Sequence, residues 1–457
     1  MRIFQRRNID EIPQLASLSA AEREAIRIVS AVLPFRVNNY VLDELIDWDR
    51  APDDPIYRLT FPHRDMLEES DFRWIERLIH EAAPPETLQA AAREIQRRLN
   101  PHPAGQTDLN VPRLDGRPIA GIQHKYRETV LFFPTQGQTC HTYCSYCFRW
   151  PQFVGLDGLK FASRESQELV RYVESQPRVR SVLLTGGDPL VMRTKLLRRY
   201  IEPLLASPQL TSIRLGSKSL AYWPSRFVDD TDADDLLRLF EEVVAAGKNL
   251  AFMAHCSHPR ELATPMAERA IARVLGTGAT IRCQAPLIRH VNDDAALWAT
   301  MWSQQVQLGA IPYYMFVERD TGARHYFEVP LVRAHRIFNE AYSNVSGLAR
   351  TVRGPSMSAS PGKIVIDGMP EIQGQKVFAL RFLQARDPSW VGRPFYAQYD
   401  PKVAWLDGLR PAFGESRFFF EQAEACPARR NRLPLLSEAH PVDRPEDGRA
   451  RSVLIRA

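Results

Sequence analysis

Short apolar segments alternate with amphipathic segments through the middle of this 457-residue chain, and this alternation constrains the fold more than any other feature. Short apolar runs bounded by turn-forming residues are typical of buried strands, whereas apolar residues at helical intervals indicate amphipathic helices. The expected strands are Val130–Phe133, Ser181–Thr185, Thr211–Leu215, Leu250–Ala254, Thr280–Ala285 and Pro312–Val317. The expected helices are Arg164–Ser175, Thr194–Ala206, Asp232–Ala246, Pro265–Leu275, Asp293–Leu308 and Leu331–Ser343.

Repeated strand-helix units need crossover connections, which are right-handed and produce a parallel sheet. Two α/β folds satisfy such repeats, an incomplete (β/α)6 barrel and a doubly wound open sheet. We expect the incomplete barrel, because a cysteine-rich segment follows the first strand. That is the carboxyl edge of the sheet, where parallel α/β proteins place their chemistry.

The sequence before these units is mainly helical. Ser19 and Glu22 have the spacing of a capping box in front of an apolar pattern with helical period. A second helix is expected from Pro84-Pro85 to Leu99. We therefore expect a helical N-terminal appendage over residues 1–115.

The α/β core is expected over residues 116–363, followed by a C-terminal extension over 364–457. The tail from about Ser437 is rich in proline and charge and has little to bury. In the extension, the apolar runs Phe378–Leu383 and Phe418–Phe420 suit a subunit interface or an intramolecular lid equally well.

The composition limits the classes of protein to consider. A net charge of +5, from 59 basic and 54 acidic residues, is weak for a nucleic-acid binder. No apolar run approaches the ~20 residues that span a bilayer, and the first residues lack a signal-peptide core. Six cysteines, three of them clustered, argue against a disulfide framework and for a reducing compartment. We expect a cytoplasmic protein that acts on a small molecule and binds neither nucleic acid nor membrane.

Three cysteines, Cys140, Cys144 and Cys147, form a C-x₃-C-x₂-C run directly after the first expected strand. They offer only three thiolates to a metal centre that requires four ligands, which leaves one position open. The alternatives are a zinc site built from the same thiols, and cysteines that are simply buried apolar side chains. The spacing resembles the cluster loop of radical S-adenosylmethionine (SAM) enzymes, where three thiolates hold a [4Fe–4S] cluster and SAM binds the fourth iron.

A second motif, Gly186-Gly187-Asp188-Pro189, follows the second expected strand. Paired glycines let the backbone approach a ligand closely, although Gly-Gly and Asp-Pro are also common turn signals. The motif resembles the Gly-Gly-acid segment with which radical SAM enzymes hold the amino group of SAM. This resemblance implies that Gly186, Gly187 and Asp188 bind SAM.

From about Pro34 to Lys363 the chain resembles the lysine 2,3-aminomutase family. The matching segments are His124-Lys125-Tyr126, Cys147-Phe148-Arg149, Thr185–Pro189, Arg214–Lys218, His258–Glu261, Gln284, Arg289–Asp293, Pro312-Tyr313-Tyr314 and Pro361-Gly362-Lys363. Members of that family combine the cluster and SAM with pyridoxal 5′-phosphate (PLP). The resemblance implies an isomerase in which an electron donor such as a flavodoxin or ferredoxin drives SAM cleavage. The resulting 5′-deoxyadenosyl radical removes a hydrogen from C3, and the amino group held by PLP moves from C2 to C3.

The resemblance also implies roles for single residues. Lys363 stands where relatives carry the Schiff-base lysine, and Arg149 stands where they carry the arginine that binds the substrate carboxylate. Thr129 stands where relatives carry a further arginine before the first strand, so either Arg127 takes the place of that arginine or no residue does. Any of the basic side chains could equally be a solvated surface charge. By their positions, Lys125, Arg127 and Lys218 are the residues expected at the PLP phosphate, Tyr126 is expected near the PLP ring, and Gln284 is also expected to bind a cofactor.

The chain departs from the lysine-specific members where they hold the distal ammonium group of the substrate. Arg319 and Ser356 occupy the two positions of the family's aspartates, although Asp320 is one residue away. With Arg324 and Arg353 nearby, this favours a substrate whose far end is acidic or neutral over free L-lysine. A protein-bound lysine is a further alternative.

Some relatives carry a cysteine-rich zinc site near the C-terminus, whereas this chain has only Cys426 there. We therefore expect no structural zinc, and the sequence leaves a homo-oligomer open. Two competing functions are a radical SAM enzyme of the same fold with another hydrogen-abstraction reaction, and a metal-binding regulatory protein without turnover.

Overall fold

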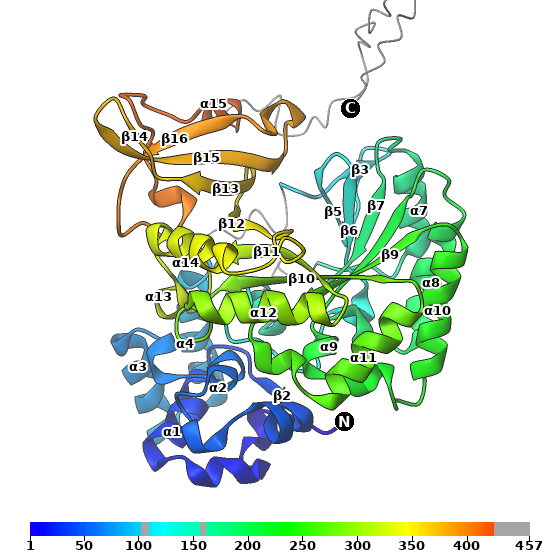
Figure 1. The fold of residues 1–457 in the computed structure, drawn as a ribbon. Coiled ribbons are helices and arrows are strands. Elements are labelled where there is room, and N and C mark those ends of the chain that lie inside the picture. The colour runs from blue at the N-terminus through cyan, green and yellow to red at the C-terminus, as the bar shows by residue number, and fades with distance from the viewer. Residues whose placement is uncertain (102–108, 156–160, 425–457) are drawn as a thin grey trace, which may run out of the picture.

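The computed structural model describes residues 1–101, 109–155 and 161–424. In Figure 1 the N-terminal helices lie at the lower left, a parallel α/β core occupies the centre and right, and an antiparallel sheet lies at the upper left. The predicted tail from Ser437 and the residue Cys426 lie outside the described residues.

The N-terminal region contains short helices and one small antiparallel pair, β1 (Ile3–Gln5) with β2 (Arg36–Asn38). The predicted capping box is confirmed: the Glu22 backbone N–H donates to Ser19 Oγ at 3.2 Å, and the Ser19 N–H donates to the Glu22 carboxylate at 2.7 Å. The apolar faces of these helices form a second core, which also includes residues from the connections of the α/β region, such as Trp150, Tyr222 and Phe327. The α-helices are α1 (Ala20–Val29), α2 (Pro55–Thr60), α3 (Glu69–His80) and α4 (Pro85–Arg98), and the last of these confirms the second predicted helix.

The core sheet contains parallel strands whose order follows the chain without reversal. A doubly wound sheet needs a reversal of strand order, so that alternative is wrong. The six predicted strands are each confirmed to within two residues. The parallel strands are β6 (Thr129–Phe132), β7 (Ser181–Leu184), β8 (Ser212–Ser217), β9 (Asn249–His255), β10 (Thr280–Leu287), β11 (Ile311–Val317) and β12 (Arg353–Ser358).

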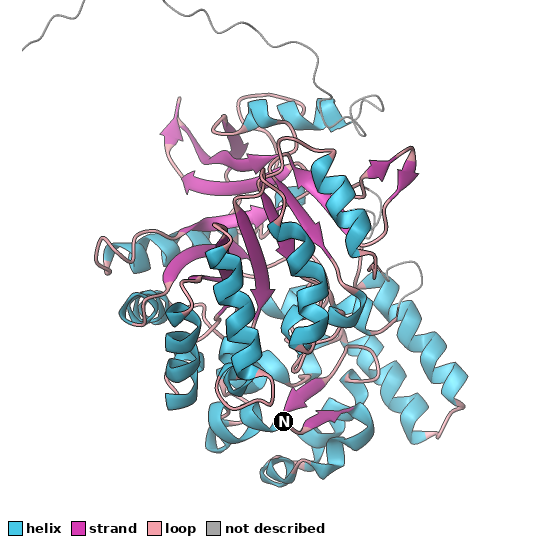
Figure 2. Ribbon diagram, turned by 90° about the vertical axis from the view of Figure 1, so that its right-hand side faces the viewer, coloured by secondary structure: helices cyan, strands magenta, loops and turns pink. Residues whose placement is uncertain are grey.

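The connecting helices lie outside these strands in both ribbon views (Figures 1 and 2). All six predicted helices are confirmed, and their apolar residues share one large core with the strands. The helices are α7 (Ser166–Glu174), α8 (Thr194–Leu205), α10 (Ala233–Ala245), α11 (Pro265–Gly276), α12 (Ala295–Gln307) and α14 (Leu331–Ser343). Shorter helices in the connections are α6 (Trp150–Phe153), α9 (Ser219–Tyr222) and α13 (Arg324–Phe327).

Antiparallel strands continue the sheet at both edges. β5 (Ile122–Tyr126) pairs with β6, and β13 (Gly362–Gly368) pairs with β12. The outer strands are β14 (Glu371–Ile372), β15 (Gln375–Ala385) and β16 (Pro394–Gln398), and a small separate pair is β3 (Arg113–Leu114) with β4 (Arg117–Pro118).

The aromatic residues of the C-terminal extension are buried within this chain. Phe378, Phe418 and Phe420 are each at most 5% exposed and pack in one cluster with Phe382 and Phe395. The two apolar runs therefore form an intramolecular core. The last described helix is α15 (Phe419–Glu424).

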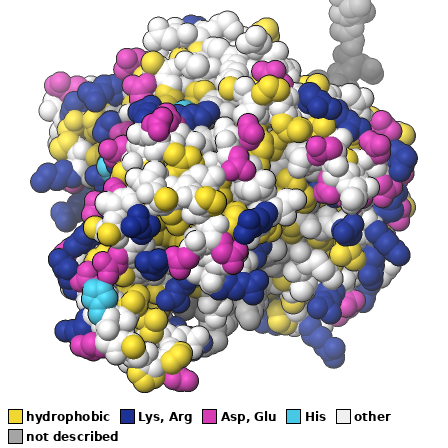
Figure 3. Space-filling view, turned by 90° about the horizontal axis from the view of Figure 1, so that it is seen from below, with side chains coloured by type: hydrophobic (Ala, Val, Ile, Leu, Met, Phe, Trp, Pro, Cys, Tyr) yellow, Lys and Arg dark blue, Asp and Glu magenta, His cyan; other side chains and the backbone are white. Residues whose placement is uncertain are grey.

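Charges of both signs are interspersed over the underside of the molecule, with hydrophobic side chains between them (Figure 3). Within the described residues, no helix has both the length and the apolar character needed to cross a membrane.

Candidate active site

The cysteine loop follows β6 and is anchored by the N-terminal region. The backbone N–H of Tyr143 donates to the Arg36 carbonyl oxygen at 2.9 Å, and that of Ser145 donates to the Leu59 carbonyl oxygen at 2.8 Å. In the other direction, the Arg36 guanidinium donates to the Cys140 carbonyl oxygen at 3.0 Å. The N-terminal helical region is thus part of the site's framework as well as an appendage.

The three thiols of the loop are unpaired and partly buried. Burial raises the pKa of Cys144 to about 12 and that of Cys147 to about 11, and each of these two thiols also opposes ionisation of Cys140. A cationic iron centre would reverse this balance and deprotonate the thiols, so the donor set fits a cluster. No three His, Cys, Asp or Glu side chains converge on a single-ion site within the described ranges. A [4Fe–4S] cluster instead takes each thiolate on a separate iron.

The two glycines of the Gly-Gly-acid motif press against the start of the cysteine loop. A Cβ on Gly187 would lie 2.3 Å from the Thr139 carbonyl oxygen, and one on Gly186 would lie 2.3 Å from Gln138 Nε2. Gly186 also has a φ of +150°, which side chains disfavour. The backbone N–H of Gly187 donates to the Gly137 carbonyl oxygen at 3.0 Å. The glycines therefore let this turn dock against the loop.

Asp188 is buried, and its carboxylate is already occupied by groups of the chain itself. It accepts hydrogen bonds from Ser217 Oγ at 2.8 Å, from the Lys218 backbone N–H at 2.9 Å and from the Leu190 backbone N–H at 3.0 Å. His141 Nε2 lies 3.3 Å away. Burial alone would raise the pKa of Asp188, but the hydrogen bonds from His141 and the backbone lower it overall. Asp188 therefore links the cysteine loop, through His141, to the end of β8, through Ser217 and Lys218.

Two polar side chains meet where the last residue of β9 lies beside Gln284 of β10. Gln284 was predicted from the sequence, and its Nε2 lies 2.8 Å from His255 Nε2. Burial lowers the pKa of His255 to about 4, with Lys218 and Arg149 adding to the effect, so the imidazole is neutral. Sequence analysis missed His255, although a polar residue that ends a buried parallel strand is a usable signal.

Lys218 was expected near the PLP phosphate, but in the structure its ammonium group pairs with a buried carboxylate. Its Nζ lies 2.8 Å from Glu261 Oε1 in a buried ion pair, and it also contacts Ser257 Oγ at 3.4 Å. Burial lowers the pKa of Lys218, but Glu261 and then Cys144 outweigh this and raise it. The pair leaves Lys218 beside the cysteine loop with its charge neutralised.

Arg149 lies between two aromatic rings just beyond the cysteine loop. Its guanidinium carbon is 4.7 Å from the Phe133 ring centre and 5.0 Å from that of Phe148, and its Nη2 donates to Thr185 Oγ1 at 3.4 Å. Burial lowers the pKa of Arg149 to about 10, and the nearby Arg319 contributes to this. Within the described ranges no carboxylate pairs with this guanidinium, so it can bind the carboxylate of a ligand.

Lys363 lies on β13 and directs its amine toward the aromatic residues of β11. Its Nζ lies 4.1 Å from the Tyr314 ring centre and 5.2 Å from that of Phe316. Burial lowers the pKa of Lys363 to about 7, and Arg214 and Arg353 contribute to the shift. A substantial share of the amine is therefore neutral and nucleophilic near pH 7, as the chemistry of a Schiff-base lysine requires.

Of the other predicted PLP contacts, two lie near the segment that leads to Lys363 and one does not. The Lys125 ammonium donates to the carbonyl oxygen of Ala359, in the segment that leads to Lys363, and Tyr126 Oη is buried without a well-formed hydrogen bond. Arg127 is instead half-exposed and bonded to the neighbouring Glu128 at 2.7 Å. The expectation that Arg127 takes the place of the family's missing arginine is therefore not supported by its position.

The residues expected near the far end of the substrate are not all in the site, because some are buried there and one is partly exposed. Arg319 is buried with its Nε unbonded, and Ser356 Oγ is buried and unbonded. Asp320 is buried beside Arg319. Arg324 is partly exposed and bonded to Glu328 at 2.7 Å, so it does not join the site as predicted.

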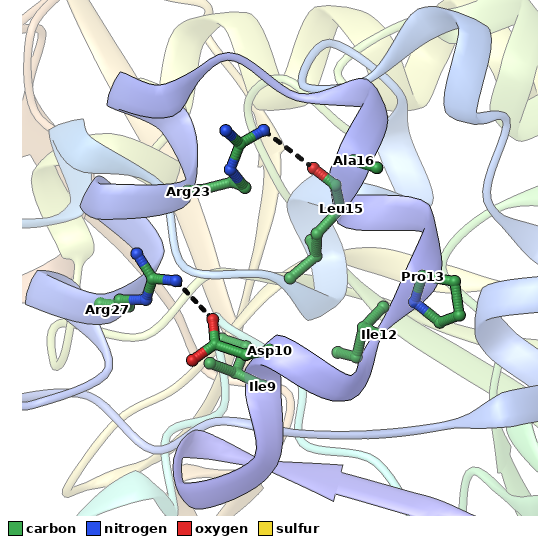
Figure 4. Close-up of a pocket in the computed structure, with 8 residues that line it drawn as sticks. All are labelled: Ile9, Asp10, Ile12, Pro13, Leu15, Ala16, Arg23 and Arg27. Carbon is green, nitrogen blue, oxygen red and sulfur yellow. Dashed lines mark hydrogen bonds and ion pairs between the residues drawn. The ribbon is translucent and has the colours of Figure 1, made fainter.

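A hollow in the N-terminal region shares no residue with these elements (Figure 4). It lies between residues 9–16 and α1. Arg23 donates there to the Leu15 carbonyl oxygen at 3.4 Å, and Arg27 pairs with Asp10. Both guanidinium groups are thus occupied, and the hollow has no link to the cysteine loop.

A parallel α/β core with a C-x₃-C-x₂-C loop after its first parallel strand defines a radical SAM enzyme. No protein-family model matches the chain. A protein of Aquifex aeolicus (strain VF5) named "Putative L-lysine 2,3-aminomutase" is 32% identical over 400 residues, which are 87% of this chain and 92% of the relative. The chain therefore belongs to the lysine 2,3-aminomutase family. It is an isomerase of the radical SAM class that uses SAM and a [4Fe–4S] cluster.

Other relatives agree at lower identity. The L-lysine 2,3-aminomutase of Clostridium subterminale is 26% identical, over 74% of this chain and 70% of its own length. That of Escherichia coli (strain K12) is 27% identical, over 54% of this chain and 69% of its own length. Among solved structures, a radical SAM methyltransferase from Sphaerobacter thermophilus has a TM-score of 0.37 and 17% identity, over 61% of this chain and 91% of its own.

Proposed function

We propose that this chain is a PLP-dependent 2,3-aminomutase that moves the amino group of an amino acid from C2 to C3. The observation that carries the proposal is Lys363. Its amine has a pKa lowered to about 7, forms no ion pair within the described ranges, and lies over the Tyr314 ring. A buried lysine with a lowered pKa beside an aromatic face fits the covalent attachment of an aldehyde.

The proposed architecture is the incomplete (β/α)6 barrel, with the chemistry on its concave side. The strand order supports this, since the parallel strands follow the chain without reversal and the helices lie outside them. Its divisions are the helical region 1–115, the core 116–363 and the extension 364–457. A one-electron donor such as a flavodoxin or ferredoxin belongs to the same proposal, and so does a homo-oligomer.

Each cofactor has residues that would hold it. Cys140, Cys144 and Cys147 would hold the cluster, the turn at Gly186-Gly187 with Gln284 and His255 would contact SAM, and Lys363 with Lys125 and Tyr126 would hold PLP. When bound, these groups would supply a carbon radical that removes hydrogen and an electron sink for the migrating nitrogen.

Side chains of the protein itself would bind and orient the substrate. Arg149 would bind the substrate α-carboxylate through two parallel hydrogen bonds, and the rings of Phe133 and Phe148 would keep the guanidinium in place. Asp188 would position the cysteine loop through His141 and the end of β8 through Ser217. Fixing the α-carbon in this way limits the reaction to one hydrogen atom.

The substrate class follows from the far end of the site. A distal ammonium group would meet the buried guanidinium of Arg319, which costs free energy unless an acid is placed between the two cations. A substrate with an acidic or neutral far end is therefore favoured over free L-lysine. Competition turnover with lysine, glutamate and neutral amino acids tests this, and preferred turnover of lysine would overturn it.

The test of the central role is to locate the PLP attachment site. The whole protein, with its cluster reconstituted anaerobically, is incubated with PLP, reduced with borohydride and digested for mass spectrometry. We expect the label on Lys363 and none in Lys363→Ala. Lys376 is the control, because its Nζ lies over the Tyr399 ring at a similar 4.2 Å but is exposed. Equal labelling of Lys376 and Lys363 would contradict the proposal.

A further inference from the structure

Three arginines from alternate strands gather on the same side of the sheet as Lys363. Arg214 lies on β8, Arg282 on β10 and Arg353 on β12. The guanidinium of Arg353 lies 4.4 Å from the Tyr313 ring centre and 4.2 Å from that of Tyr314, while that of Arg282 lies 5.2 Å from Tyr313. We call these three residues the arginine triad.

A β-bulge explains how two consecutive tyrosines can serve one face. Cys283 pairs with Pro312 but the next residue, Gln284, pairs with Tyr314, so Tyr313 is an extra residue in β11. Neighbours in a regular strand point to opposite faces, and a bulge redirects one of them. The rings of Tyr313 and Tyr314 lie 4.6 Å apart, nearly edge-on. Both rings therefore contact the guanidinium group of Arg353, and that of Tyr313 also contacts the guanidinium group of Arg282.

No acid neutralises the triad within the described part of the chain. Its guanidinium groups form no ion pair and no hydrogen bond there, in contrast to Arg226, which bonds to Asp232 at 2.6 Å. Burial lowers the pKa of Arg214, and Arg282 and Arg353 add to that shift. Like charges held this close destabilise the fold unless an anion binds between them.

We propose that Arg214, Arg282 and Arg353 form a binding site for a dianionic phosphate group next to Lys363. Planar guanidinium groups match phosphate oxygens two at a time, and the tyrosine rings keep them oriented. If PLP is attached at Lys363, as the proposed function holds, its phosphate is one source of this anion, and free inorganic phosphate is the other. The assignment replaces Arg127 and Lys218, which are paired with Glu128 and Glu261.

The first experiment tests the anion site without any cofactor. Thermal unfolding of the full chain is followed in phosphate and in chloride at matched ionic strength, for wild type, Arg214→Gln and Arg353→Gln. We expect phosphate to raise the unfolding temperature of wild type and to have little effect on either variant. The control is Arg393→Gln, since Arg393 also lies over an aromatic ring, Phe419 at 3.8 Å, but directly before β16 in the C-terminal extension. An equal response to phosphate in all four proteins would overturn the site.

The second experiment identifies the source of the anion by comparing PLP with pyridoxal, which lacks the phosphate. In Arg214→Gln and Arg353→Gln we expect PLP binding to weaken at least about tenfold, with pyridoxal binding unchanged. Equal losses for both compounds would overturn the assignment, because the residues would then act on the ring or the fold. A lost phosphate response with unchanged PLP affinity would support the anion site and overturn PLP as its source.

Folding failure is checked with a second variant. Removing one like charge should leave the ligand-free protein at least as stable as wild type, and Arg353→Lys keeps the charge while losing the planar fork. We expect intermediate PLP affinity for Arg353→Lys, and wild-type affinity would contradict bidentate binding. Wild-type protein that never attaches PLP at Lys363 would refute the proposed function but would leave the phosphate result standing.

Discussion

The amine of Lys363 lies 4.1 Å from the centre of the Tyr314 ring. The two residues come from different strands, because β13 turns back against β12 and directs the lysine across it to β11. Lys363 pairs with Ser358 on one side and Gln384 on the other, so the backbone fixes its position. Burial and two nearby arginines then lower the pKa of its amine to about 7.

This lowered pKa predicts how attachment of an aldehyde depends on pH. Only the neutral amine reacts, so the attachment rate of pyridoxal at Lys363 should rise through about pH 7 and level off above it. An ordinary lysine would keep gaining reactivity up to about pH 10.4. In Arg353→Gln the midpoint should move upward, because one of the charges that disfavour the protonated amine is removed. A rate in wild type that rises steadily to about pH 10 would contradict this account.

Gly187→Ala should displace the cysteine loop from its contact with the turn at Gly186-Gly187. The added Cβ would lie 2.3 Å from the Thr139 carbonyl oxygen, and backbone atoms cannot move away as a flexible side chain can. We expect a loss of stability of a few kcal/mol, roughly 1–3, and loss of bound iron after reconstitution. Gly276→Ala is the matched control, since nothing lies within 4 Å of its added Cβ, and it should be neutral or slightly stabilising. Full iron content in Gly187→Ala would show that the close packing is not needed.

Breaking the ion pair between Lys218 and Glu261 should lower the free energy of unfolding by a large amount. Both partners are buried and 2.8 Å apart, so Glu261→Gln leaves an unpaired buried ammonium. Denaturant unfolding should show a loss of about 3–5 kcal/mol. The control is Glu242→Gln, which breaks an exposed pair with Arg198 and should cost about 1 kcal/mol or less. Similar losses in the two variants would argue that Lys218 is not buried in the folded protein.

Replacing any one of Cys140, Cys144 and Cys147 by alanine should abolish the cluster. Wild type should bind about four iron atoms per chain after anaerobic reconstitution, and each variant close to none. Cys283→Ala is the control, because Cys283 is buried on β10 in the hydrophobic core and should leave the iron content unchanged. Iron retained in all three variants would remove the thiols from the site.

The periodic elements of the core could be predicted from the sequence because their signals are local. Helix α14 matches the expected Leu331–Ser343, and each expected strand lies in the sheet. The seventh parallel strand, β12, was missed because Arg353, Gly354 and Pro355 break its apolar pattern. The short helix α2 was missed because its six residues gain their stability from packing in the N-terminal core.

The site was predictable where chemistry is tied to chain position, and not where it depends on contacts between distant strands. The spacing of Cys140, Cys144 and Cys147 is visible in the sequence. The partner of Lys218 is not, since Glu261 approaches it only through the fold. The arginine triad is likewise invisible, because its members come from separate strands and the bulge at Tyr313 has no sequence signature.

The most direct test is to follow the amino group itself. The anaerobically reconstituted protein, with PLP, SAM and a one-electron reductant, is given amino acids labelled with ¹⁵N at C2, and the products are read by NMR. We predict label at C3 for at least one amino acid with an acidic or neutral far end, dependent on Lys363, on Cys144 and on each cofactor. Cleavage of SAM with no movement of the label in any amino acid, lysine included, would contradict the account.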